Sequence, residues 1–157
     1  MRMLKIYLET TIFNYYFDYD RDAHPYTLKL FDEIKQGKYE AYTSVYTLAE
    51  LNRTEEIKRN KMLSLIDKYA IKVLDSSSEA ESLANLYIQN GIIPPKQTND
   101  ALHIAISSVN DIDIILSLNF RHIVKRKVIA AVEFINKNNG YSRIEINAPM
   151  EVVDDEN

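Results

Sequence analysis

The chain of 157 residues is about one domain long, with room for one continuous domain core but not for two. It contains no cysteine, which excludes disulfides and thiolate metal sites and fits a cytoplasmic protein, and no apolar run approaches the ~18 residues of a membrane span. The net charge of -4 argues against nucleic-acid binding over the whole surface, although acids gathered in one cleft and bases on its rim would still permit it.

Strand-like and helical segments alternate along the first half of the chain. In order, they are a strand at 5–8, a helix at 26–36, a strand at 40–43, helices at 45–51 and 54–69, and a strand at 71–74. Glu9 directly follows the first strand, at its carboxyl end. Ser44 is suited to cap the helix at 45–51, which carries Glu50.

The second half of the chain continues in the same way. In order, it gives helices at 78–90 and 98–109, a strand at 113–117, a helix at 126–138 and a strand at 143–146. Ser78 and Glu81 have the spacing of a capping box, which predicts that Ser78 caps the first of these helices. Asp100 lies in the first turn of the second helix, where the helix dipole favours an acid, and Asn119 follows the fourth strand.

Five short strands separated by helices predict an α/β domain with a mainly parallel five-stranded sheet and helices on both faces, a three-layer α/β/α arrangement. The domain is expected to span residues 1–150, and residues 151–157 read as an acidic, flexible tail. In such sheets ligands bind beyond the carboxyl ends of the strands, where the strand order reverses. A functional site is therefore expected at that edge.

Four polar side chains are expected at this edge: Glu9, Glu50, Asp100 and Asn119. Three carboxylates that converge repel one another, so at least one pKa should rise unless a cation compensates. Oxygen ligands without cysteine suit Mg²⁺ or Mn²⁺ rather than Zn²⁺. Such an ion lowers the pKa of a bound water and stabilises the leaving oxygen in phosphodiester hydrolysis. Three of these residues also have a structural alternative: Asp100 as a helix-start acid, Glu50 as a solvated helical glutamate and Asn119 as a turn residue.

Four segments that span nearly the whole chain together resemble the PIN-domain family, which includes the VapC-type toxins. They are the first strand with Glu9-Thr10-Thr11, the helical Glu50, the run Asn99-Asp100-Ala101-Leu102-His103-Ile104-Ala105, and the run from Ile115 to Ile123. The resemblance implies a compact α/β/α domain with a metal-dependent ribonuclease site, whose acidic positions are filled here by Glu9, Glu50 and Asp100.

The sequence departs from the family pattern at two of these positions. Glu9 stands where aspartate is usual, and Asn119 stands where a further aspartate is usual. Glutamate reaches one methylene further and would place a metal differently. Asparagine keeps an oxygen ligand but removes a charge, so a second metal ion should bind more weakly.

Four further side chains are candidate substrate contacts: Thr10, His103, Arg121 and His122. Thr10 would hydrogen-bond a metal ligand or satisfy the strand end, and His103 would lie at the rim of the site or be a structural histidine of its helix. Arg121 and His122 would contact a substrate phosphate or pair with a neighbouring acid. Both belong to a basic cluster that continues through Lys125-Arg126-Lys127, whereas a second cluster at 58–61 reads as a solvated helix face.

The resemblance to VapC-type toxins implies three partners. They are RNA as the substrate, an antitoxin protein as the inhibitor, and a second copy of the chain in a homodimer. The aromatic segment at 13–19 is a candidate groove or dimer surface, and ordinary core packing is the alternative interpretation.

The leading hypothesis is a Mg²⁺- or Mn²⁺-dependent endoribonuclease, either the toxin of a toxin–antitoxin pair or a solitary housekeeping nuclease. The alternative is a catalytically degenerate PIN-fold module that binds nucleic acid or protein, motivated by Asn119 and the negative net charge. A signalling receiver domain is a weaker hypothesis, because Asp75 ends the third strand but the first strand lacks a paired acid. A dinucleotide-binding domain is disfavoured because no glycine-rich turn follows the first strand.

Overall fold

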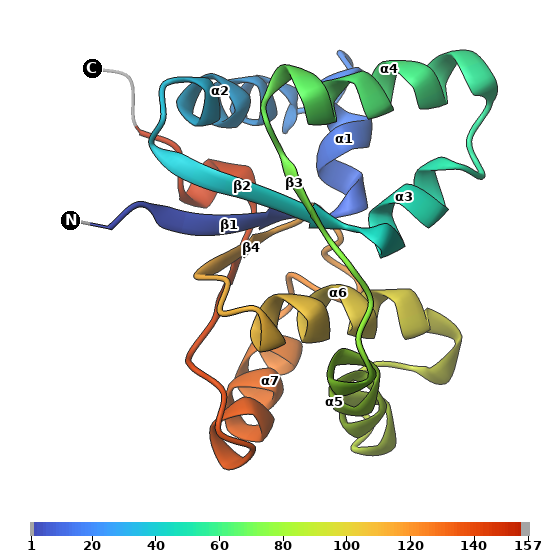
Figure 1. Ribbon diagram of the computed structural model, residues 1–157, viewed down its shortest axis with the longest axis vertical. Coiled ribbons are helices and arrows are strands. Elements are labelled where there is room, and N and C mark those ends of the chain that lie inside the picture. The colour runs from blue at the N-terminus through green and yellow to red at the C-terminus, as the bar shows by residue number, and fades with distance from the viewer. Residues whose placement is uncertain (1, 155–157) are drawn as a thin grey trace.

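The computed structural model describes residues 2–154, and at its centre is a sheet of five strands (Figure 1). The strands are β1 (Leu4–Leu8), β2 (Tyr39–Ser44), β3 (Lys72–Leu74), β4 (Ile114–Leu116) and β5 (Glu145–Asn147). Their order is β3-β2-β1-β4-β5, and every neighbouring pair is parallel. The predicted parallel sheet is therefore confirmed, and its strand order reverses at β1.

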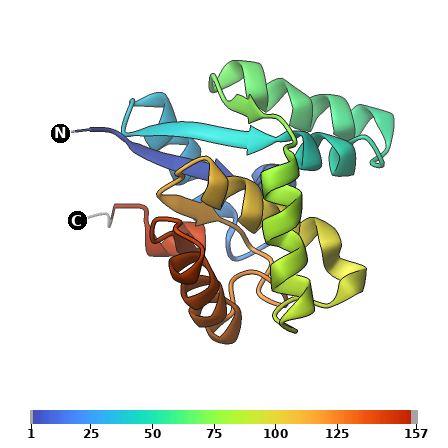
Figure 2. The same ribbon diagram turned by 60° about the horizontal axis from the view of Figure 1, so that its bottom comes forward.

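Helices cover both faces of this sheet (Figures 1 and 2). They are α1 (Thr10–Tyr16), α2 (His24–Lys35), α3 (Val45–Leu51), α4 (Glu56–Lys68), α5 (Ser78–Gln89), α6 (Thr98–Val109) and α7 (Arg126–Asn138), with short 3-10 turns η1 (Pro95–Gln97) and η2 (Pro149–Glu151). Helices α1 to α4 lie on one side, and α5 to α7 lie on the other. Within residues 2–154, no helix has the length and apolar character needed to cross a membrane.

The strand β1 explains why the core is divided into two hydrophobic clusters, one on each face of the sheet, rather than being the single continuous core expected from the chain length. Its residues Ile6, Tyr7 and Leu8 are completely buried, and alternate side chains of a strand point to opposite faces of the sheet. Ile6 and Leu8 pack with the apolar side chains of α1 to α4, whereas Tyr7 packs with those of α5 to α7. The three-layer α/β/α arrangement predicted from the sequence is thus present.

The register between β1 and β4 determines what lies at the carboxyl edge. Leu8 pairs with Leu116, and the Glu9 amide donates to the Leu116 carbonyl oxygen at 3.0 Å. The residues that follow the two strands, Glu9 and Ser117, therefore leave the sheet side by side. Helix α1 begins at Thr10 without any intervening loop.

The first half of the aromatic segment at 13–19 belongs to helix α1, which spans residues 10–16. Phe13 is completely buried, and Tyr16 and Phe17 pack against the same core. Core packing therefore accounts for these three side chains. Tyr19 is 76% exposed and remains available at the surface.

The predicted capping box at Ser78 and Glu81 is wrong. The hydroxyl of Ser77 accepts a hydrogen bond from the Ala80 amide at 3.1 Å, so Ser77 caps α5 and Ser78 is its first residue. Two consecutive serines offer the same capping group, and the extended backbone of Ser77, with φ of -147°, decides between them.

The carboxyl-terminal segment is packed further than the expected boundary at residue 150. Val152 and Val153 contact the core beside α2, and the Asp154 amide donates to Glu33 Oε2 at 2.9 Å. Lys38 also forms an ion pair with the Asp154 carboxylate. Burial of the two valines favours this arrangement in an otherwise acidic segment. Residues 155–157 of the expected tail lie outside the described residues.

Candidate active site

Glu9 stands where β1 ends and α1 begins, and only 2% of its surface is exposed. Its Oε1 accepts hydrogen bonds from the Thr11 amide at 3.3 Å, the Thr11 hydroxyl at 2.6 Å and the Ser117 hydroxyl at 2.7 Å. The other oxygen, Oε2, receives no hydrogen bond from residues 2–154. Burial raises the pKa of Glu9, and the charge of His103 and the hydrogen bonds offset this only in part.

A chain of hydrogen bonds connects Glu50 on α3 to the core. Glu50 Oε1 lies 2.6 Å from Nε2 of His103, which is completely buried on α6. The other ring nitrogen, Nδ1, lies 2.6 Å from the Tyr7 hydroxyl, which lies 2.6 Å from the Ser44 hydroxyl. Because a carboxylate only accepts, Nε2–H donates to Glu50. Nδ1 accepts from the Tyr7 hydroxyl when the ring is neutral and donates to it when the ring is protonated. The hydroxyl of Thr10 is 3.5 Å from Nε2.

The pKa values of this pair shift in opposite directions. Burial opposes ionisation of Glu50, but the hydrogen bond and charge of His103 outweigh it, so the Glu50 pKa is lowered. Burial likewise opposes protonation of His103, but the hydrogen bond to Glu50 and the charges of Glu9, Glu50 and Asp100 raise its pKa. A positively charged imidazole is therefore stabilised among the carboxylates.

Glu9, Glu50 and His103 form a compact cluster. Each supplies one potential ligand atom, and these atoms all lie within 4.8 Å of one another. The structure thus brings together two of the acids chosen from the sequence, and His103 is completely buried with them instead of lying at the rim of the site. The spacing of Asp100 and His103, three residues apart on one helix, was the signal that could have placed this histidine inside the site.

Asp100 lies beside this cluster, in the first turn of α6, with 8% of its surface exposed. Its Oδ1 accepts a hydrogen bond from Asn119 Nδ2 at 3.2 Å, whereas its buried Oδ2 has no partner among residues 2–154. Burial raises the pKa of Asp100, and the nearby charge of Glu50 acts in the same direction, while His103 and His122 oppose it. Asp100 therefore belongs to the same electrostatic site as Glu50.

Asn119 is held by the loop that follows β4. Its Oδ1 accepts from the His122 amide at 3.0 Å, its own amide donates to the Ser117 hydroxyl at 3.0 Å, and its NH₂ group points to Asp100. The expectation from the sequence was an oxygen ligand at this position. In the structure the side-chain oxygen of Asn119 already caps the turn, and the residue holds Asp100 in place.

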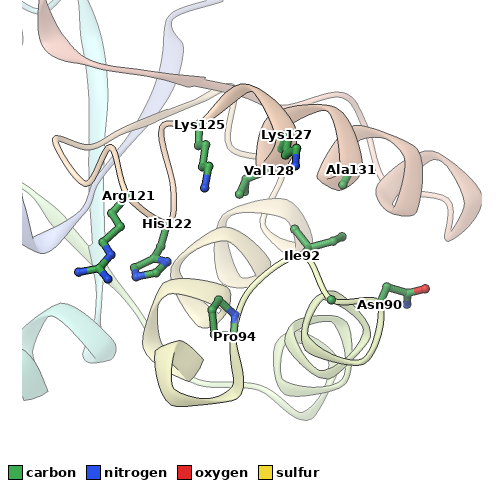
Figure 3. Close-up of a pocket in the computed structure, with 10 residues that line it drawn as sticks. Asn90, Ile92, Pro94, Arg121, His122, Lys125, Lys127, Val128 and Ala131 are labelled. Carbon is green, nitrogen blue, oxygen red and sulfur yellow. The ribbon is translucent and has the colours of Figure 1, made fainter.

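Arg121 and His122 lie on the rim, where they line a cavity together with Lys125 and Lys127 (Figure 3). Neither Arg121 nor His122 forms an ion pair within residues 2–154, so the pairing considered for them is not observed there. Their side chains remain available to a ligand.

The arrangement suits a divalent cation that prefers oxygen ligands. Asp100 Oδ2 is buried without a hydrogen-bond partner, which is costly for an ionised carboxylate unless a cation is near. The pKa values of Glu9 and Asp100 are also raised, because the nearby positive charges and hydrogen bonds do not fully offset the effect of burial on the ionised carboxylates. Carboxylate oxygens with one imidazole in reach fit Mg²⁺ or Mn²⁺, and the chain has no thiolate to offer a softer metal.

Comparisons with known proteins agree with this fold. The family model of the PIN domain matches residues 6–127. VapBC2 from Rickettsia felis, solved bound to a DNA fragment from its promoter, has a TM-score of 0.58 and 15% identity, and the match covers 92% of this chain and 98% of that chain. VapC20 from Mycobacterium tuberculosis, described as a sarcin-ricin loop cleaving toxin, has a TM-score of 0.54 and 13% identity, with 88% and 98% covered. No curated protein matches the chain.

Proposed function

The chain belongs to the PIN domain family, and we propose from this premise that it is a metal-dependent endoribonuclease that hydrolyses phosphodiester bonds in RNA. The observation that carries the proposal is the convergence of Glu9, Glu50 and His103 within 4.8 Å, with Asp100 beside them. The description of VapC20 as a toxin that cleaves the sarcin-ricin loop supports RNA as the substrate class.

Glu9, Glu50 and Asp100 would hold the ion, Mg²⁺ or Mn²⁺. When bound, the ion supplies a water of lowered pKa and stabilises the charge on the leaving oxygen. The surrounding residues keep the carboxylates in place: Ser117 and Thr11 occupy one oxygen of Glu9, and His103 orients Glu50. Asn119 occupies Oδ1 of Asp100 and leaves Oδ2 for the ion.

The proposal extends to the partners of the protein. The structural likeness to VapBC2 supports an antitoxin as the inhibitor of this nuclease and a role as the toxin of a cytoplasmic pair. We also propose a homodimer, for which the exposed Tyr19 at the end of the aromatic segment offers a contact point. Arg121 and His122 are the proposed substrate contacts at the rim of the site, whereas Thr10 is buried beside His103.

The proposal is tested with purified protein, Mn²⁺ and a panel of structured and single-stranded RNAs. Cleavage is expected, with complete loss in EDTA and a decrease of at least about a hundredfold in Asp100→Asn. Asp111→Asn is the matched control, because Asp111 is an exposed carboxylate whose φ of 55° asparagine tolerates equally well. Intact RNA across the whole panel would contradict the proposal.

A degenerate module that binds nucleic acid or protein without cleaving it is the second candidate. It is favoured by one observation, the NH₂ group of Asn119 that points to Asp100 where the family pattern has a carboxylate. Such a module would leave RNA intact in the same experiment. Calorimetric titration with Mn²⁺ then separates a site that binds metal without turnover from one that binds none.

A further inference from the structure

A cavity with a strongly basic lining lies beside the carboxylate site. It has a volume of about 590 Å³ and lies between the loop that follows β4, the first turns of α7 and the segment after α5 (Figure 3). Part of its lining is basic and part is apolar, and no acidic residue belongs to it. The basic residues are Arg121, His122, Lys125 and Lys127, and the apolar wall includes Ile92, Val128 and Ala131.

The basic side chains of this cavity are available to a ligand. None of the four basic side chains forms an ion pair with any residue in the range 2–154. In Figure 3 they lie along one side of the opening, across from Ile92 and Pro94, and Lys125 is directed toward it. Arg121, Lys125 and Lys127, three cations without an ion-pair partner around one hollow, create a positive potential that favours an anion.

The position of the lysines on α7 points to the same conclusion. Lys125 is the N-cap of α7 and makes no side-chain capping bond, and the first turn contains Lys127 but no acid. The amino terminus of a helix carries the positive end of its dipole, where anions are favoured and cations are not. The helix therefore carries cations where they weaken it, and a bound anion would remove this conflict.

The loop from Asn119 to His122 joins the cavity to the carboxylates. Asn119 donates to Asp100 at 3.2 Å and accepts from the His122 amide at 3.0 Å. The imidazole of His122 lines the cavity, and its charge acts to lower the pKa of Asp100. A ligand in the cavity would therefore lie next to the proposed site of hydrolysis.

We propose that this cavity is a subsite for one nucleotide of single-stranded RNA next to the bond that is cleaved. A nucleotide combines a charged phosphate, suited to Lys125 and Lys127, with a flat apolar base, suited to the wall that includes Val128. The volume lies within the roughly 300–1,000 Å³ of small-molecule sites. Unpaired RNA is favoured because a base that is already paired in a duplex cannot lie on this wall.

The choice of RNA as the ligand rests on the proposed function, but the test does not need cleavage. Binding of labelled single-stranded RNA is measured by fluorescence anisotropy with the Asp100→Asn protein in EDTA. Lys125→Ala combined with Lys127→Ala is expected to weaken binding about tenfold and to lower the slope of log K against log salt by about 1.4, or 0.7 for each phosphate contact. Loss of folding is not expected, because removal of cations from a helix amino terminus leaves stability unchanged or raises it.

The control removes two lysines from another helix, by Lys58→Ala combined with Lys61→Ala in α4, where both residues are exposed. An equal loss of affinity in this control would show diffuse attraction and overturn the subsite. Competition by polyglutamate as effective as that by RNA would indicate an acidic protein as the occupant and would also overturn it.

The two proposals fail in different ways. Lys125-dependent RNA binding by a protein that cleaves no RNA would refute the nuclease and support the subsite. RNA cleavage by a protein whose binding is unchanged in the Lys125 and Lys127 variant would support the nuclease and refute the subsite.

Discussion

Nε2 of His103 lies 2.6 Å from Oε1 of Glu50, and the imidazole that makes this contact is completely buried. The contact joins α6 to α3, and the second ring nitrogen is held by Tyr7 on β1 at 2.6 Å. One histidine therefore fixes the geometry of a carboxylate that comes from a different part of the chain. This relationship makes His103 a positioning residue for the proposed metal site.

Replacement of His103 should weaken metal binding. His103→Ala removes the donor that orients Glu50, and because 29% of the Glu50 side chain is exposed, the carboxylate can then turn toward water. We expect the affinity for Mn²⁺ to fall about 10- to 100-fold, the usual effect of removing a hydrogen-bond partner of a ligand. Calorimetric titration with Mn²⁺ measures this change in affinity. His103→Gln, which retains an N–H donor, should recover part of the loss.

His24 provides the matched control for this measurement. It is also a buried histidine, with Nδ1 2.8 Å from the Tyr15 carbonyl oxygen, but it lies outside the carboxylate cluster. His24→Gln should leave the Mn²⁺ affinity unchanged. The same affinity in His103→Ala and the original protein would refute the positioning role.

The metal-free protein should be more stable in mild acid than in mild base. His103 has a raised pKa in the folded state, so its contribution to stability is complete below about pH 6.5 and is lost as the pH rises through the folded pKa. The raised pKa values of Glu9 and Asp100 act in the same direction. The lowered pKa of Glu50 adds a contribution that is present above about pH 4.3 and is lost only in stronger acid.

Urea unfolding in EDTA measures this dependence. The midpoint should be higher near about pH 6 than near about pH 8.5, and His103→Gln, which cannot titrate, should reduce the difference. A midpoint that rises between the two pH values would show that the histidine is neutral in the folded protein throughout this range.

Asn119→Asp should strengthen metal binding and weaken the metal-free fold. The change replaces an NH₂ donor, 3.2 Å from Asp100 Oδ1, with a second carboxylate at the same place. We expect a loss of about 1–2 kcal/mol in the free energy of unfolding without metal, and a gain of about tenfold in Mn²⁺ affinity, because ligand charge increases affinity for hard cations. Thermal unfolding with and without Mn²⁺ tests both effects, and an unchanged metal affinity would contradict the expectation.

The sequence predicted the residues that follow strands better than those that lie within them. Glu9 and Asn119 could be placed because parallel strands end at one edge, and Ser117 could have been found by the same rule from its position after Leu116. Tyr7 could not, since a tyrosine in a fully buried strand reads as core. Its partner His103 lies 96 residues away, and only the packing of α6 on the sheet brings them together.

Details that depend on the exact position of one side chain could not be predicted from the sequence either. Ser77 and Ser78 have the same capping group, and only the backbone conformation shows which one caps α5. Asp100 and His103 share a helix face by their spacing, but whether that face is covered depends on α3 and β1, which supply Glu50 and Tyr7. Tertiary packing decides such questions, and local patterns do not contain it.

Removal of the residues after Glu151 should destabilise the protein. The truncation exposes the core that Val152 and Val153 cover, and it removes the amide of Asp154 that donates to the buried Glu33 carboxylate at 2.9 Å. We expect a loss of about 1–3 kcal/mol, measured by urea unfolding, since the buried carboxylate then loses one of its hydrogen-bond donors. Unchanged stability would mean that the segment behaves as the flexible tail expected from its acidic composition.

The central claim is that Glu9, Glu50 and Asp100 act on RNA through a divalent ion. The most direct measurement is the rate of RNA cleavage during a Mn²⁺ titration, compared with Glu9→Gln, which retains the oxygen that Thr11 and Ser117 bind. The account predicts no cleavage without metal, saturation at the Mn²⁺ concentration at which calorimetry shows binding, and at least about a hundredfold lower rate in Glu9→Gln. Cleavage that persists in EDTA, or a Glu9→Gln protein as active as the original, would contradict it.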